Sequence, residues 1–181
     1  MKPEEVADFR TFVESRWSGL VRTAYLLTGD HGIAEDVAQS TLTKAYVNWR
    51  RVQRADNPDA YVRRVLVNTN TERFRKRRVA EHLVAEQLGA EPPQHPDLDP
   101  YLRVDERQML RTALADLPAR QRAVVVLRYW DDLSELEVAR TLGCSLGTVK
   151  SQAAKGLKRL RAHPGLAGIH LRDEEYADDR A

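Results

Sequence analysis

The sequence predicts an all-α protein in which two small helical bundles are joined by a flexible acidic linker, and the C-terminal bundle contains a helix-turn-helix. Apolar residues recur at helical spacing along most of the 181 residues, and no stretch shows the alternation expected of a half-buried strand. Four prolines between residues 89 and 100 interrupt the helical pattern and indicate a linker. We therefore expect a bundle over 1–78, a linker over 79–104, a second bundle over 105–162 and an acidic tail over 163–181.

Three helices are expected in the first bundle. The first covers residues 3–28 and ends at Gly29, and Asp30 can cap the second. A loop rich in cations over residues 50–57 leads to the third helix, in which Pro58 lies near the first turn, where proline is favoured. Apolar spacing assigns to the core Val6, Phe9, Val13, Leu20, Ala24, Leu27, Ala34, Val37, Ala38, Thr41, Ala45, Trp49, Tyr61, Val62, Val65, Leu66 and Phe74.

The net charge of +2 conceals a strong segregation of charge. Residues 44–78 contain eleven lysines and arginines against three acidic residues, whereas residues 79–106 contain seven acidic residues and one arginine. Two basic surfaces, one on the third helix and one in the C-terminal bundle, indicate a polyanionic partner contacted at two places. Spacings of four, three, four and three residues give the third helix one polar face, formed by Arg64, Asn68, Thr71, Arg75 and Arg78, with Lys76 beside them.

The most specific motif lies between residues 133 and 161. Ser134 and Glu137 have the spacing of a capping box that begins a short helix. Gly143 can end this helix, and Ser145 can cap a longer one after it. This combination is typical of a helix-turn-helix, whose outer face meets base edges and phosphates in a major groove. Here that face carries Thr148, Lys150, Ser151, Gln152, Lys155, Lys158 and Arg159.

The sequence does not favour an enzyme or a cofactor-binding protein. It lacks a phosphate-binding glycine loop and a dinucleotide fingerprint, and its five histidines and single Cys144 do not have metal-ligand spacing. We therefore expect no catalytic residue, no cofactor and no metal site. No apolar run is long enough to span a bilayer, and the N-terminus lacks the pattern of a signal peptide. A single cysteine cannot form an internal disulfide, which favours the cytoplasm.

Three ordered blocks of the sequence resemble the sigma factors of bacterial RNA polymerase, in particular the small extracytoplasmic-function (ECF) type. The first block is YLLTGDHGIAEDVAQSTLTKAYVNW and the second is NPDAYVRRVLVNTNTERFRKRR. The third is LPARQRAVVVLRYWDDLSELEVARTLGCSLGTVKSQAAKGLKRLR. The first block, and TVKSQ in the third, are most similar to the SigE-like actinobacterial branch of the family.

This resemblance implies a subunit that binds core RNA polymerase, directs it to promoter DNA and assists DNA opening, without catalysing a reaction itself. The helix that carries Asp36 and Gln39 would dock on the clamp helices of the largest polymerase subunit. The polar face of the third helix and the loop over 50–57 would hold the promoter element that melts, with Trp49 and Tyr61 near the unstacked base. The helix-turn-helix would read the distal element. Whether an anti-sigma factor also binds is left open.

Other interpretations remain open from the sequence alone. Because the C-terminal motif also resembles the output domain of response regulators, the chain could be a free-standing regulator that binds duplex DNA without polymerase. It could also be a helical adaptor that binds another protein through its first bundle. The polar face of the helix-turn-helix could be merely solvated, and Asn68 fits a buried amide bonded to the backbone as well as it fits a contact to a base or ribose.

Overall fold

A computed structural model of the chain describes the backbone of residues 3–85 and 104–166, and the side chains of residues 3–75 and 108–166. Every secondary-structure element within these ranges is a helix, which confirms the predicted all-α class. The predicted tail from residue 167 onward, and residues 86–103 of the predicted linker, lie outside the described residues.

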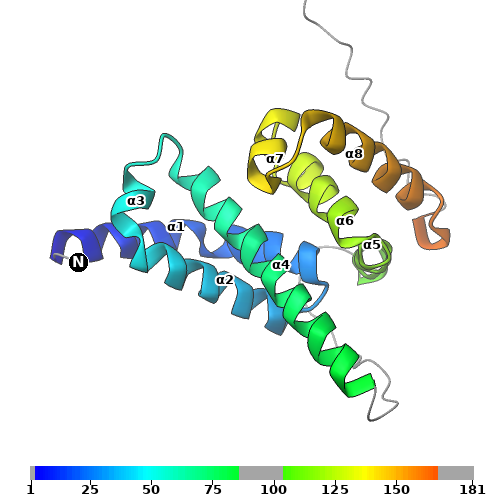
Figure 1. The fold of residues 1–181 in the computed structure, drawn as a ribbon, viewed down its shortest axis with the longest axis horizontal. Coiled ribbons are helices and arrows are strands. Elements are labelled where there is room, and N and C mark those ends of the chain that lie inside the picture. The colour runs from blue at the N-terminus through cyan, green and yellow to red at the C-terminus, as the bar shows by residue number, and fades with distance from the viewer. Residues whose placement is uncertain (1–2, 86–103, 167–181) are drawn as a thin grey trace, which may run out of the picture.

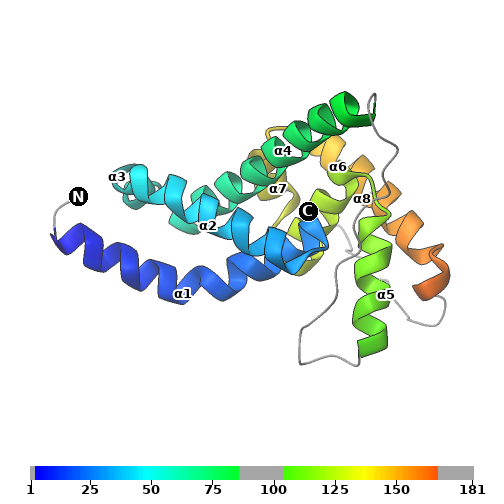
Figure 2. The same ribbon diagram turned by 90° about the horizontal axis from the view of Figure 1, so that it is seen from below.

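The helices form two halves that lie next to each other. Figure 1 shows α1–α4 on one side and α5–α8 on the other, and in the view from below in Figure 2, α1–α3 lie to the left and α5 and α8 to the right. The N-terminal half contains α1 (Pro3–Thr28), α2 (His31–Val47), α3 (Trp49–Gln53) and α4 (Pro58–Ala85). The C-terminal half contains α5 (Val104–Ala115), α6 (Ala119–Val125), the π-helical turn η1 (Val126–Trp130), α7 (Glu135–Leu142), α8 (Leu146–Arg161) and the 3-10 turn η2 (Pro164–Leu166).

The loop expected over residues 50–57 is shorter than predicted. Helix α2 ends at Val47 and is capped by Asn48, whose side-chain amide donates a hydrogen bond to the Lys44 carbonyl at 2.9 Å and so satisfies one of the last carbonyls of the helix. Residues 49–53 then form α3, and only residues 54–57 are non-helical. The cations at the start of this segment are therefore carried by a helix.

Helix α4 extends further than predicted. It continues beyond residue 78, the expected end of the first bundle, and reaches Ala85. The reason is visible in the sequence, because no glycine or proline occurs between Pro58 and Gly89 to end a helix. The change from basic to acidic composition at residue 79 marks a change in charge and not the end of the helix.

The core of the N-terminal half follows the predicted pattern closely. Trp49 is 5% exposed, and its ring centroid lies 5.1 Å from that of Phe9 and 5.3 Å from that of Phe12. These aromatic contacts attach α1 to the junction of α2 and α3. Val6, near the N-terminal end of α1, was predicted in the core but is 38% exposed. The six residues predicted for the inner face of the second helix are all buried: Ala34, Val37, Ala38, Thr41, Ala45 and Trp49.

In the C-terminal half, α8 approaches α6 closely at a glycine. A Cβ atom on Gly156 would lie only 2.7 Å from Cγ2 of Val125, so a side chain at this position would clash with α6. Val149 and Leu160 of α8 are buried on the same side of the helix. The contact turns the polar side of α8 away from the bundle.

The two halves are packed against each other, which the sequence did not predict. One continuous buried cluster contains Leu27 and Leu66 of the N-terminal half together with Leu127 and Val138 of the C-terminal half. Helices α1 and α4 contact α5, α6, η1 and α7. Apolar spacing shows which residues are buried, but it does not show whether they face their own bundle or the other one.

Gly156→Ala should lower the free energy of unfolding. Alanine favours a helix over glycine by about 1 kcal/mol, but overpacking against Val125 costs about 1–3 kcal/mol. Gly147→Ala is the matched control in the same helix, because no atom beyond its chain neighbours and its own helix backbone lies within 4 Å of its Cβ position, and it should raise stability slightly. Urea unfolding followed by circular dichroism measures both. Equal stabilisation by the two substitutions would contradict the close approach of α6 and α8.

Candidate nucleic-acid interface

The first helix of the helix-turn-helix begins with a complete capping box. Ser134 Oγ accepts a hydrogen bond from the Glu137 N–H at 3.3 Å, and the Glu137 carboxylate accepts one from the Ser134 N–H at 2.8 Å. The Ser134 hydroxyl also donates a hydrogen bond to the Glu137 carboxylate at 2.7 Å. This bond, followed by the one from the Ser134 N–H, lowers the pKa of the Glu137 carboxyl. Leu133 and Val138, on either side of the cap, are buried. The entry into α7 is thus held by both polar and apolar contacts.

The turn between α7 and α8 is also the one that the sequence predicts. Gly143 ends α7 in the left-handed conformation, with φ of 63°. Ser145 Oγ then accepts a hydrogen bond from the Thr148 N–H at 3.2 Å and caps α8. Cys144, between these two residues, is half-buried and packs against the core. Helices α7 and α8 are in contact, and the helix-turn-helix geometry is confirmed.

The α8 face consists of the seven residues predicted to contact DNA. Five of them are exposed: Lys150, Ser151, Lys155, Lys158 and Arg159. Thr148 and Gln152 are half-buried, and the Thr148 hydroxyl lies 2.9 Å from that of Ser145. Lys150 Nζ lies 3.7 Å from a Glu135 carboxylate oxygen, an exposed ion pair that contributes little to stability. The face therefore offers cations along its length and an amide at its centre.

The α4 face consists of the exposed residues Arg64, Asn68, Thr71 and Arg75. The exposure of Asn68 removes the alternative in which its amide is buried and bonded to the backbone. Thr71 Oγ1 donates to the Val67 carbonyl at 2.8 Å and keeps its lone pairs available for a donor. The side chains of Lys76 and Arg78, which were predicted on the same face, lie outside the described residues.

Trp49 is not available to stack on a nucleic-acid base, contrary to the expectation from the sequence. Its ring is buried between Phe9 and Phe12, where it stabilises the bundle. Tyr61 is half-buried and packs against the same cluster. The helical spacing had already placed both residues in the core, and this assignment is the one that the packing supports.

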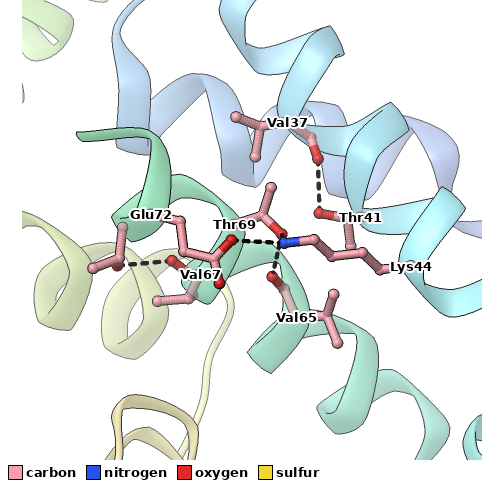
Figure 3. Close-up of polar contacts among 8 residues, drawn as sticks. Val37, Thr41, Lys44, Val65, Val67, Thr69 and Glu72 are labelled. Atoms are coloured by element: carbon pink, nitrogen blue, oxygen red, sulfur yellow. Dashed lines mark hydrogen bonds and ion pairs between the residues drawn. The ribbon is translucent and has the colours of Figure 1, made fainter. Parts of the chain in front are cut away.

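Asp36 and Gln39, the predicted polymerase contacts, are both exposed on α2. Asp36 lines a shallow groove between α2 and α4. Lys44 crosses this groove, and its Nζ donates to Thr69 Oγ1 at 3.1 Å and to the Glu72 carboxylate at 2.9 Å, as Figure 3 shows. One side of the groove is therefore formed by polar side chains that are hydrogen-bonded to each other, and the exposed Asp36 carboxylate lies beside them.

Sequence reasoning missed most of the residues that line this groove. It counted Lys44 and Arg73 among the basic residues and Glu72 among the acidic ones, placed Val37 in the core, and gave no role to Ser40 and Thr69. The missing signal is the pairing of α2 with α4, because Lys44 is 25 and 28 residues away from its two partners. Helical spacing within one segment contains no information on contacts at that separation.

Within residues 3–75 and 108–166, no three histidine, cysteine or acidic side chains come together as metal ligands would. None of the described helices is both long enough and apolar enough to cross a membrane.

Two protein-family models match the chain, one in each half. The model of Sigma-70 region 2 matches residues 8–79, and the model of Sigma-70 region 4 matches residues 107–160. The RNA polymerase sigma-E factor of Streptomyces coelicolor is 40% identical over 157 residues, which cover 87% of this chain and 86% of that protein. The ECF RNA polymerase sigma factor SigL of Mycobacterium tuberculosis is 30% identical over 158 residues, which cover 87% of this chain and 89% of that protein. The chain belongs to the ECF sigma factors.

A solved sigma factor has the same fold. The sigma factor RpoE of Bartonella quintana, in complex with the anti-sigma factor NepR, superposes with a TM-score of 0.73 and is 26% identical, and the match covers 90% of this chain and 98% of that chain. As an ECF sigma factor, the chain binds core RNA polymerase and promoter DNA in transcription initiation and is not an enzyme. The match to region 2 excludes the alternatives of a free-standing regulator and an adaptor.

The stability contributed by the two N-caps should differ in its dependence on pH. Ser134→Ala and Ser145→Ala should each cost about 1 kcal/mol near neutral pH. The folded-state pKa of Glu137 is lowered, so its contribution is present above the unfolded pKa of about 4.3 and is lost as the pH falls through the folded value. The cost of Ser134→Ala should therefore shrink in acid.

Ser145→Ala is the control for this effect, because the residue three positions after Ser145 is Thr148, which does not titrate in acid. Urea unfolding of both variants and the unsubstituted chain, near neutral pH and below pH of about 4, gives the two costs. A cost for Ser134→Ala that changes with pH no more than that for Ser145→Ala would show that the Glu137 carboxylate is not part of the cap.

Proposed function

We propose that the α8 face reads one promoter element, that the α4 face holds a second element as it opens, and that α2 docks on core polymerase. The observation that carries this assignment is the exposure of both faces, on two halves that the family models match separately. In each helix the opposite side is buried in the core, so the polar residues are not needed for folding. The charges and hydrogen-bonding groups of these residues, and their exposed positions, suit a contact with DNA.

On the α8 face, the cations and the amide of Gln152 have different roles. Lys155, Lys158 and Arg159 are exposed cations in the C-terminal part of α8, and they suit phosphates, which fix register and orientation. Gln152 is held half-buried near the middle of the helix, where an amide can make a bidentate contact to an adenine edge. The helix N-terminus, capped by Ser145, enters the groove first.

On the α4 face, the arginines and the amide suit a strand that leaves the duplex. Unstacking a base costs a few kcal/mol, and positive charge beside the displaced strand offsets part of that cost. Asn68 lies between Arg64 and Arg75 on this face and has both a donor and an acceptor for a base or ribose edge. Because the Trp49 ring is buried, the unstacked base is held by the polar side chains of the α4 face and not by stacking on that ring.

We also propose the cytoplasm as the location, because polymerase and DNA are the partners of a sigma factor and the single Cys144 fits a reducing compartment. The relative from Bartonella quintana was solved with an anti-sigma factor. An anti-sigma factor is therefore proposed as a further partner of this chain.

Lys158→Ala and Gln152→Ala should have different effects on the holoenzyme. Loss of the phosphate contact at Lys158 should weaken binding to all promoter sequences and lower the slope of log K against log salt by about one. Loss of the amide at Gln152 should cost about 1–3 kcal/mol on the preferred sequence and relax the preference at one or two base pairs. Holoenzyme binding to a library of promoter variants, at several salt concentrations, measures both. A change of preference in Lys158→Ala with none in Gln152→Ala would contradict the roles assigned to them.

Asp36→Arg should reduce the affinity for core polymerase at least about tenfold, because it replaces an exposed carboxylate with a charge of the opposite sign at the proposed contact. Glu35→Arg makes the same change of charge on the neighbouring residue, which points about 100° away around α2, and it should have a much smaller effect. Fluorescence anisotropy of labelled sigma factor titrated with core polymerase gives both affinities. Equal losses would show that only the net charge of α2 matters.

A further inference from the structure

Lys44 of α2 holds two residues of α4 in the groove between these helices, as Figure 3 shows. Its Nζ donates one hydrogen bond to the Thr69 hydroxyl at 3.1 Å and another to the Glu72 carboxylate at 2.9 Å. Thr69 Oγ1 in turn donates to the Val65 carbonyl of its own helix at 2.8 Å. The two hydrogen bonds from Lys44, which we name the Lys44 bridge, draw the Glu72 carboxylate toward α2.

Glu72 lies at the edge of the α4 face. It is four residues after Asn68 and three before Arg75, and side chains at these spacings lie on the same side of a helix. It is also the only acidic residue over 60–80, a stretch with seven lysines and arginines. An unbalanced carboxylate at this place would repel the phosphates of a strand that binds the α4 face.

Apolar packing already holds α2 against α4. Val37 of α2 and Leu66 of α4 belong to the same buried cluster. The side chains of Lys44 and Glu72 are 44% and 52% exposed, and an ion pair of that exposure contributes little to stability. The charges of the Lys44 bridge therefore matter more for what approaches the groove from solution than for the fold.

The Lys44 bridge also connects the two helices to which separate roles are assigned. Lys44 and Asp36, the proposed polymerase contact, both belong to α2 and line the same groove. On α4, Thr69 directly follows Asn68, which is proposed to contact a base or ribose. Two of the three N–H groups of the Lys44 ammonium are used for the bridge. The charge of Lys44 is thus directed at Glu72.

We propose that Lys44 is a positioning residue for promoter opening, which balances the charge of Glu72 and turns its carboxylate toward α2, so that no acid repels the displaced strand on the α4 face. This inference rests on the role proposed above for the α4 face. Lys44 acts through Glu72 and does not touch the DNA. Its loss leaves one unbalanced negative charge beside the strand. A unit charge about 4 Å from a phosphate in water changes the affinity about fivefold.

Neutral substitutions on both sides of the bridge test this role. Lys44→Met removes the cation at nearly constant length, Glu72→Gln removes the acid, and the double variant removes both. Holoenzyme with saturating core polymerase is titrated with a fork-junction DNA, in which the distal element is double-stranded and the second element is single-stranded. Lys44→Met should weaken binding about fivefold. Glu72→Gln should tighten it, because Lys44 is then an unbalanced cation, and the double variant should return to the native affinity.

Arg16→Met is the matched control. Arg16 of α1 forms an ion pair with Asp59 of α4 at 2.7 Å, and the two side chains are 50% and 40% exposed. Its loss also lowers the net charge by one and also removes an ion pair that ends on α4. Asp59 lies thirteen residues before Glu72, about 20 Å away along the helix. Because charges beyond about 10 Å are largely screened at about 0.1 M salt, this variant should bind the fork-junction DNA as the native chain does.

The dependence on salt separates the role of charge from a role in the fold. The deficit of Lys44→Met should shrink as the salt concentration is raised, because screening weakens the repulsion by Glu72. A deficit caused by altered packing of α4 would persist in salt. It would also persist in the double variant, because Glu72→Gln cannot restore the hydrogen bonds that Lys44 made.

A double variant that binds as weakly as Lys44→Met would overturn the proposal, because Lys44 would then contact the DNA itself. Equal losses in Lys44→Met and Arg16→Met, or no loss in Lys44→Met, would also overturn it. Asn68→Ala in the same assay separates this inference from the assignment of the α4 face. If Asn68→Ala weakens binding and Lys44→Met does not, only the role of Lys44 is wrong. If neither weakens binding, the assignment of the α4 face is wrong as well.

Discussion

The buried guanidinium of Arg122 connects three helices, and the rest of the structure depends on the positions that it gives them. Its Nη atoms donate to the Leu27 carbonyl of α1 and to the carbonyls of Ala115 and Leu117 at the end of α5. Only 9% of the residue is exposed, and burial lowers the pKa of the guanidinium. Because arginine remains charged even when its pKa is lowered, the charge has to be balanced by these carbonyls. Without the ends of α1 and α5, Arg122 would be a buried cation without partners.

The helix positions that Arg122 stabilises also determine how the DNA-facing residues are oriented. Arg122 belongs to α6, and α6 contacts α8 where Gly156 leaves room for Val125. The buried side of α8 is thereby fixed, and its cations must face outward. In the N-terminal half, α2 contacts α4 through Leu66 and the Lys44 hydrogen bonds, so the α4 face is also directed to solvent. A protein with a net charge of only +2 thus presents two concentrated basic surfaces.

The parts of the structure that sequence could predict are those that depend on neighbouring residues. The capping box of Ser134 and Glu137, the left-handed Gly143 and the shared polar face of α4 all follow from local spacings, whereas the sequence left open whether Asn68 on that face is buried or exposed. Contacts between distant residues could not be predicted in this way. Thr23 and Asp131 are 108 positions apart, and neither has a property in the sequence that marks it as a partner of the other. Lys44 with Thr69 is a similar case. The burial of Trp49 was predicted from helical spacing, but its aromatic character also fitted stacking on DNA, and only the packing excludes that role.

We propose that two separate surfaces of one sigma factor, the α4 face and the α8 face, contact two separate promoter elements in the holoenzyme. Photo-crosslinking tests this most directly, with a photoreactive amino acid at position 68 in one variant and at position 152 in another, each assembled with core polymerase on promoter DNA. Each position should crosslink to a single short stretch of DNA, and the two stretches should be separated by more than one helical turn, about 34 Å. Crosslinks from both positions to the same stretch, or from neither position to DNA, would contradict it.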